Sequence, residues 1–69
     1  MKAVSGKHLA RLAEQKGWKL VRISGSHHIY ALPGTASRVV IPIHGNQSLK
    51  IGLLRGLMKL IPLTEEELT

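Results

Sequence analysis

Hydrophobic positions near the start of the chain follow a helical period. Leu9, Leu12 and Ala13 fall on one stripe at the i, i+3, i+4 spacing. Ser5 precedes them, and a serine hydroxyl at a helix N-cap accepts a hydrogen bond from an otherwise unpaired amide. Gly17 follows them and is typical of a helix end. The pattern therefore predicts a helix between Ser5 and Gly17.

The middle of the chain changes to β-leaning runs separated by turn residues. Three strands are predicted, over residues 19–24, 27–32 and 38–43. Gly25 and Ser26 separate the first two, and a Pro-Gly loop over residues 33–37 separates the last two. Pro42 has no amide to donate to a sheet, so we expect it at an edge or near the end of its strand.

The last part of the chain returns to a helical period. Gly52 and Gly56 weaken this helix by about 1 kcal/mol each relative to alanine, and Pro62 ends it. Thr64 and Glu67 have the spacing of a capping box, which predicts a short final turn. The apolar face of the helix is predicted to comprise Leu53, Leu54, Leu57, Met58 and Ile61.

The predicted order is α-β-β-β-α in one small α+β domain over residues 1–69. Short connections favour a three-stranded antiparallel sheet with two helices on one face, leaving the other face free for solvent or a ligand. Alternation places His27 and Ile29 on one face and His28 and Tyr30 on the other. A bulge near Gly25 would reverse this phase, so either histidine remains a candidate for the free face.

The net charge of the chain indicates what kind of partner it binds. Ten Lys and Arg against four Asp and Glu give a net charge of +6 and a pI near 10.4. Three of the four acids are residues 65–67, so Glu14 alone stands against all ten bases in the rest of the chain, a balance of +9. Such a field attracts polyanions, which favours RNA or DNA over the alternative of a merely soluble basic protein.

Composition excludes several classes of protein. There is no cysteine, which rules out a disulfide framework, a thiolate metal site and a thiol nucleophile. No apolar run approaches the roughly 18 residues of a membrane span, and no signal-peptide segment follows Met1. We therefore expect a cytoplasmic protein that does not bind membranes.

The densest polar cluster is Gly25-Ser26-His27-His28. A histidine titrates near neutrality, so it can take a proton from a ribose hydroxyl or give one to a leaving oxygen. RNA supplies its own nucleophile, the 2′-hydroxyl, so neither a metal nor another cofactor is required. The cations available to stabilise negative charge on phosphorus are Arg22, Arg38 and Lys50. The alternative is that the two histidines are ordinary polar residues at a strand start.

Other chemistries fit less well. Adjacent histidines in a strand point to opposite faces and chelate one zinc ion poorly, and the chain has no Asp for a Ser-His-Asp triad. His44 is interpreted as a solvated loop histidine, and Trp18 as a core residue. Gly25 permits a positive φ and close approach of a phosphate to the backbone, or serves only a hairpin turn.

Several short segments follow one another in a characteristic order. They are Ser5-Gly6-Lys7, Gly17-Trp18, Val21-Arg22, Gly25-Ser26-His27-His28-Ile29-Tyr30, Arg38-Val39-Val40-Ile41-Pro42 with His44, Leu49-Lys50-Ile51-Gly52 and Leu54-Arg55. In this order the chain resembles the HicA toxin family of mRNA interferases over about residues 5–63. The combination is specific, whereas the Gly-Ser-His segment alone is weak. The chain departs from the family by Gly52-Leu53-Leu54 in place of Gly-Thr-Leu, which removes a helix-capping hydroxyl, and by Gly56 and Pro62 in the last helix.

The resemblance implies a fold like that of the double-stranded RNA-binding domain and metal-independent endoribonuclease activity against mRNA. It assigns the catalytic histidine to His27, which follows Gly-Ser, and implies a HicB-type antitoxin that covers this residue. We expect Arg22, Gly25, Ser26, His28, Arg38 and Lys50 to contact the RNA. Two alternatives are a non-catalytic RNA-binding module of the same shape and a silent toxin copy that only binds its antitoxin.

Overall fold

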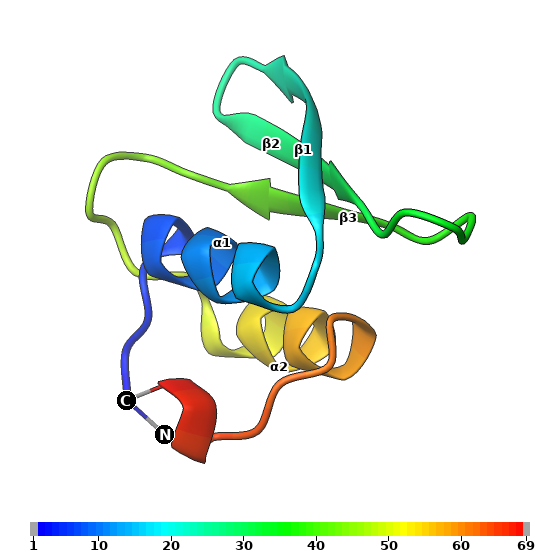
Figure 1. Ribbon diagram of the computed structural model, residues 1–69. Coiled ribbons are helices and arrows are strands. Elements are labelled where there is room, and N and C mark those ends of the chain that lie inside the picture. Colours follow the sequence, from blue (N-terminus) through cyan, green and yellow to red (C-terminus); the bar gives the residue numbers. More distant parts are fainter. Residues whose placement is uncertain (1, 69) are drawn as a thin grey trace.

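The computed structural model of the protein describes residues 2–68, and its first element, α1 (Gly6–Gln15), has both predicted caps (Figure 1). The Ser5 hydroxyl accepts a hydrogen bond of 3.1 Å from the His8 amide. At the other end the amides of Gly17 and Trp18 donate to the carbonyls of Glu14 and Ala13, and Gly17 has φ +98°. These two bonds form a Schellman motif, which confirms the predicted end of the helix.

The three strands form one antiparallel sheet in the order β1 (Lys19–Ser24), β2 (His27–Ala31) and β3 (Arg38–Pro42). Strands β2 and β3 each end one residue earlier than predicted. The amide of Ile43 nevertheless donates to the Ser26 carbonyl at 2.8 Å, so pairing continues just past β3. Pro42 is the last residue of an edge strand, as predicted, where it removes no hydrogen bond from the sheet.

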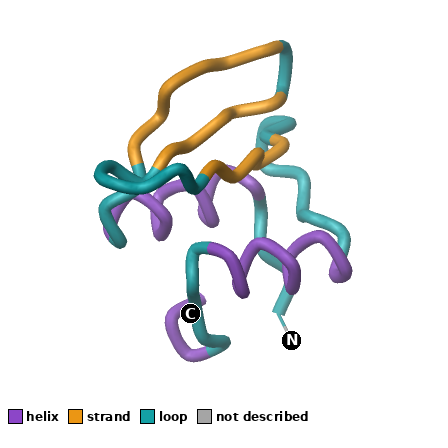
Figure 2. The backbone as a smooth tube through the Cα atoms, turned by 90° about the vertical axis from the view of Figure 1, so that its right-hand side faces the viewer, coloured by secondary structure: helices purple, strands orange, loops and turns teal. Residues whose placement is uncertain are grey.

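Both helices lie on one side of the sheet, as predicted. Figures 1 and 2 show α1 and α2 (Ile51–Leu60) forming a layer beneath the strands. The buried core side chains come from every element except β1 and include Leu9, Ala13, Tyr30, Val39, Ile41, Leu54, Leu57 and Ile61. The prediction for Leu53 is wrong: this side chain is 42% exposed, because the buried face of α2 consists of Leu54, Leu57 and Met58.

Strand β1 lies outside this core. All six of its residues are exposed, including the apolar Leu20, Val21 and Ile23. In Figure 1 the β1–β2 hairpin rises away from the helix layer. The hairpin is therefore held through β2 and offers an open strand edge to solvent.

Trp18 connects the start of the sheet to the end of α2. Its ring is 2% exposed, and Nε1 donates a 3.0 Å hydrogen bond to the Ile61 carbonyl. The indole thus buries its apolar surface while its one polar atom has a partner. The prediction of a core tryptophan is confirmed.

The C-terminal turn, η1 (Glu66–Leu68), is held by the predicted capping box. Glu67 Oε1 accepts from the Thr64 amide at 2.9 Å, and the Thr64 hydroxyl accepts from the Glu67 amide at 3.4 Å. The segment also attaches to α1, because Lys16 forms an ion pair with Glu67 and His8 Nε2 donates to the Leu68 carbonyl at 3.1 Å. Residues at both ends of the chain therefore meet on the side of the helices away from the sheet (Figure 1).

A close contact between α1 and the end of the sheet involves a glycine. Gly6 is buried, and a Cβ at this position would lie 2.0 Å from the Pro42 carbonyl oxygen and 3.3 Å from a side-chain carbon of Ile43. No other residue type fits against the backbone at that distance. The first turn of α1 therefore fixes the position of the end of β3.

Replacing Gly6 with Ala should destabilise the fold by about 2 kcal/mol or more, since the new methyl group forces backbone atoms apart. Gly56→Ala is the matched control, because Gly56 lies in the open middle of α2 with nothing within 4 Å of its added Cβ. That change should stabilise the protein by about 0.5–1 kcal/mol. Urea unfolding of both variants measures the two effects, and equal stabilities would contradict the packing role of Gly6.

The Glu67 contacts make stability depend on pH. The hydrogen bond from Lys16, followed by that from the Thr64 amide, lowers the pKa of Glu67 below its ordinary value. This stabilisation is complete above the pKa of the unfolded chain and is lost as the pH falls through the folded-state pKa. Glu67→Gln, which retains an amide oxygen as acceptor, should lower Tm slightly at pH 7 and not at pH 2. Glu65→Gln, the control for charge alone, should not show this pH-dependent difference.

Candidate functional site

A two-residue turn positions His27 at the start of β2. Ser24 and His27 pair across the hairpin, so its loop comprises Gly25 and Ser26. Gly25 has φ +62°, and no non-glycine residue within 2–68 has a positive φ. This combination, with glycine first, defines a type II′ turn, which matches the twist of paired strands. The positive φ and the hairpin turn predicted for Gly25 are therefore both confirmed, and the approach of a phosphate to its backbone stays a prediction.

A bulge in β1 brings Arg22 onto the face of His27. Leu20 pairs with Tyr30 and Arg22 with Ile29, so Val21 is an extra, unpaired residue. Without it Arg22 would point toward the helix layer. The bulge lies in β1, not near Gly25, so the alternation within β2 is unchanged. His27 is exposed on the outer face, where Ile29 also lies, as the alternation predicted.

Pro42 is the immediate neighbour of His27 on this face. The two residues are opposite one another in the β2–β3 ladder, and the preceding pair, Ser26 with Ile43, is hydrogen-bonded. Ladder bonds alternate between pairs, so His27 and Pro42 form a non-hydrogen-bonded pair, the kind whose side chains approach more closely. The imidazole of His27 therefore lies beside the proline ring at the end of the sheet.

Two of the predicted site residues do not join His27. His28 is half-buried on the helix side, opposite Ile41, so the two histidines belong to different faces. Arg38 shares the outer face of His27 but pairs with Ala31 at the other end of β2. His27 and Ala31 are four positions apart along β2, which is roughly 13 Å at the usual rise per residue. Of the predicted cations, Arg22 is the one that lies on a strand directly beside β2 near His27.

A hollow of about 240 Å³ adjoins the end of β3, and Pro42 forms one of its walls. Lys50, another predicted cation, lines it, together with Pro42, His44, Gln47, Ser48, Leu49 and Leu53. Sequence reasoning did not assign His44 or Gln47 to a site. The available signal was their place in the turn directly after Pro42, across from His27.

The wall of this hollow is fixed by backbone bonds. The amide of Gln47 donates to the His44 carbonyl at 3.0 Å and closes a turn. The amide of Leu49 donates to the Val4 carbonyl at 2.8 Å, and Ser48 bridges to Ser5. At the start of α2, Lys50 is the N-cap residue and makes no side-chain cap bond. Leu53, where the family has a threonine, lies three residues after the N-cap, so the missing hydroxyl does not belong to the N-cap position.

Negative charge is kept away from the outer face of the sheet. Residues 15–64 contain no Asp or Glu. Glu14 acts on the helix side, where burial first and the Glu14 charge second raise the pKa of Tyr30, and Glu67 pairs with Lys16. The surface around His27 thus carries cations without neighbouring carboxylates, which suits a phosphate backbone.

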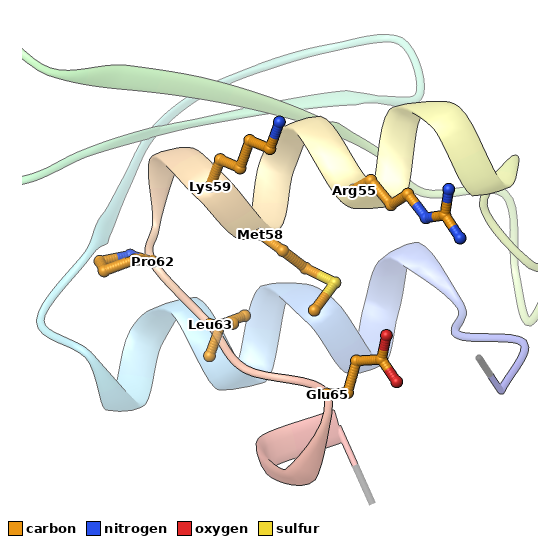
Figure 3. Close-up of a pocket in the computed structure, with 6 residues that line it drawn as sticks. All are labelled: Arg55, Met58, Lys59, Pro62, Leu63 and Glu65. Carbon is orange, nitrogen blue, oxygen red and sulfur yellow. The ribbon is translucent and has the colours of Figure 1, made fainter.

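A larger cavity of about 430 Å³ lies elsewhere, between α2 and the segment leading to η1 (Figure 3). Met58 and Leu63 contribute apolar walls, and Arg55, Lys59 and Glu65 contribute charged ones. Figure 3 shows all of these side chains on α2 and the C-terminal segment, in the helix layer and not on the outer face of the sheet. The lining of this cavity contains no histidine, and the cavity does not contribute to the site around His27.

Within residues 2–68, no group of three His, Cys, Asp or Glu side chains is placed to hold one ion. In the same part of the chain no helix is long and apolar enough to cross a membrane.

Comparison with known proteins identifies the family. None of the curated protein sequences compared with the chain matches it. The sequence pattern of one family, described as the HicA toxin of bacterial toxin–antitoxin systems, matches residues 6–62. This span includes α1, the complete sheet and α2. The chain therefore belongs to the HicA toxin family, whose members are the toxin components of toxin–antitoxin systems.

Proposed function

We propose that this toxin is a metal-independent endoribonuclease that cleaves mRNA in the cytoplasm with His27 as its general acid–base group. The observation that carries the proposal is the position of His27. Its imidazole is exposed on the free face of the sheet, on a hairpin whose bulge brings Arg22 to the same face. A proton-transfer group and a cation thus face solvent together.

The cleavage needs only groups of the RNA and the protein. His27 accepts the proton of a ribose 2′-hydroxyl, and the resulting oxygen attacks the adjacent phosphorus. The bond from phosphorus to the 5′-oxygen of the next nucleotide breaks, and that oxygen takes the proton that His27 accepted, which returns the imidazole to its starting state. The products are a 2′,3′-cyclic phosphate and a 5′-hydroxyl. The guanidinium of Arg22 stabilises the extra negative charge that develops on the phosphoryl oxygens.

The remaining predicted contacts extend the RNA-binding surface from this centre. Gly25 and Ser26 border His27 at the hairpin turn, and Lys50 lies beyond Pro42 at the start of α2. Arg38 contacts the backbone further along the sheet. His28 lies on the opposite face, so any contact that it makes with RNA is separate from the cleavage centre.

His27→Ala should reduce cleavage of a single-stranded RNA, measured with chelator present, by about 10²- to 10⁴-fold. His28→Ala is the matched control, because it removes the adjacent imidazole from the other face and should leave cleavage near the wild-type rate. Circular dichroism and Tm show whether each variant is folded. Wild-type cleavage by folded His27→Ala would overturn the assignment.

The alternative of a non-catalytic RNA-binding module shares this charge and fold. RNA binding by either kind of protein weakens steeply with salt, because phosphate contacts release counterions, so binding alone does not separate them. Wild-type protein that retains RNA without cutting either a structured or an unstructured substrate would favour the module.

The proposed partner is a HicB-type antitoxin that covers the outer face of the sheet. The family supplies the antitoxin role, and the free face carries exposed apolar surface suited to a protein partner, including Val40 at 44% exposure beside Ile29. A protein seated there would exclude RNA from His27.

Induction of the toxin in a bacterial host should stop growth, and His27→Ala should not. Co-expression of a HicB-type antitoxin should restore growth of the cells that make the wild-type toxin. A wild-type chain that accumulates in folded form without slowing growth would indicate a silent copy.

A further inference from the structure

The hollow beside His27 has the composition of a nucleotide-binding subsite. Its walls combine apolar surface from Pro42, Leu49 and Leu53 with hydrogen-bonding groups and one cation. Leu53 lies in the first turn of α2 and is 42% exposed. Its side chain forms part of this wall.

The polar side chains of the hollow suit a base and its phosphate. Gln47 offers a side-chain amide that both donates and accepts, and Ser48 offers a hydroxyl. His44 offers an imidazole, a ring on which unstacked RNA bases stack. Lys50 supplies a positive charge for the phosphate that accompanies the base.

The position of the hollow connects it to the cleavage centre. Pro42 is at once a wall of the hollow and the cross-strand neighbour of His27. A nucleotide seated there lies next to the ribose whose hydroxyl His27 activates. The hydrogen-bonded turn between His44 and Gln47 fixes the backbone from which both side chains extend.

We propose that this hollow binds the base of a nucleotide adjacent to the cleaved phosphate and that Gln47 makes the enzyme selective for that base. The proposal rests on the ribonuclease function above and adds to it a specificity-determining site. Gln47 is a positioning residue in this scheme, because it holds the base and does not exchange protons with the reacting atoms.

Leu53→Trp places an indole in the space that the base would occupy. It should raise KM for a short single-stranded RNA on the order of tenfold, the loss expected when one stacked base is displaced, with a smaller effect on kcat. Leu60→Trp is the matched control, because Leu60 is an exposed leucine of the same helix, at 62%, and does not line the hollow. Gln47→Ala should reduce the base preference next to the cut by about tenfold. Sequencing the ends of cleaved RNA measures this preference.

Binding is tested apart from cleavage with His27→Ala protein and the four nucleoside 3′-monophosphates. The amide NMR signals of Gln47, Ser48 and Leu53 should shift on titration, and adding Leu53→Trp to the same protein should abolish the shifts. This titration decides whether the hollow binds nucleotides even if the chain proves not to cut RNA, so the two proposals fail separately.

Two results would overturn the subsite. One is unchanged KM and base preference in Leu53→Trp and Gln47→Ala, with no nucleotide-induced shifts at the hollow. The other is normal RNA kinetics in Leu53→Trp together with weakened antitoxin binding, which would make the hollow a protein-docking site.

Discussion

The close packing of Gly6 against the Pro42 carbonyl is the constraint on which the functional end of the molecule depends. It fixes the first turn of α1 against the end of β3 at a distance that admits no side chain. Pro42 in turn stands beside His27 and forms a wall of the adjacent hollow. A shift of α1 would therefore move Pro42 relative to the imidazole and change the shape of the hollow. One absent methyl group thus links the helix layer to the chemistry of the opposite face.

The second constraint is local to the hairpin. A type II′ turn at Gly25 places His27 directly after the turn, and the unpaired Val21 rotates Arg22 onto the same face. These two irregularities act in one pair of strands, close to where β1 has left the support of the core. The arrangement leaves His27 exposed on the outer face of β2 while Tyr30 is buried on the other side.

The sequence was sufficient for the elements because each carries its own local signal. Ser5, Gly17 and the Thr64–Glu67 spacing define ends through bonds within a few residues, and the structure has those bonds. The bulge at Val21 was not predictable in the same way, because no glycine marks it and it depends on how β1 meets β2. The exposure of Leu53 also depends on tertiary packing, since its helical position alone places it beside Leu54 and Leu57.

For the candidate site, the sequence predicted His27 as its centre and correctly predicted its face, but did not predict its surroundings. Nothing in the sequence ranked Arg22, Arg38 and Lys50 as partners of His27. The strand register places Arg22 closer to His27 than Arg38, and Lys50 lies at the start of α2. His44 and Gln47 carried no motif of their own. Both residues line the same hollow as Pro42, and Pro42 pairs with His27 across the strands. This pairing brings the turn after β3 near His27.

The open edge of β1 has a consequence for the toxin when no partner covers it. An exposed strand that carries Leu20, Val21 and Ile23 is a template for pairing with a second copy of itself, which leads to aggregation. Lys19 and Arg22 lie on the same strand, so edge-to-edge pairing of two copies would bring like charges together. The positive charge that attracts a polyanion thus also keeps identical molecules apart, and neutralising these two cations would cost the free protein its solubility.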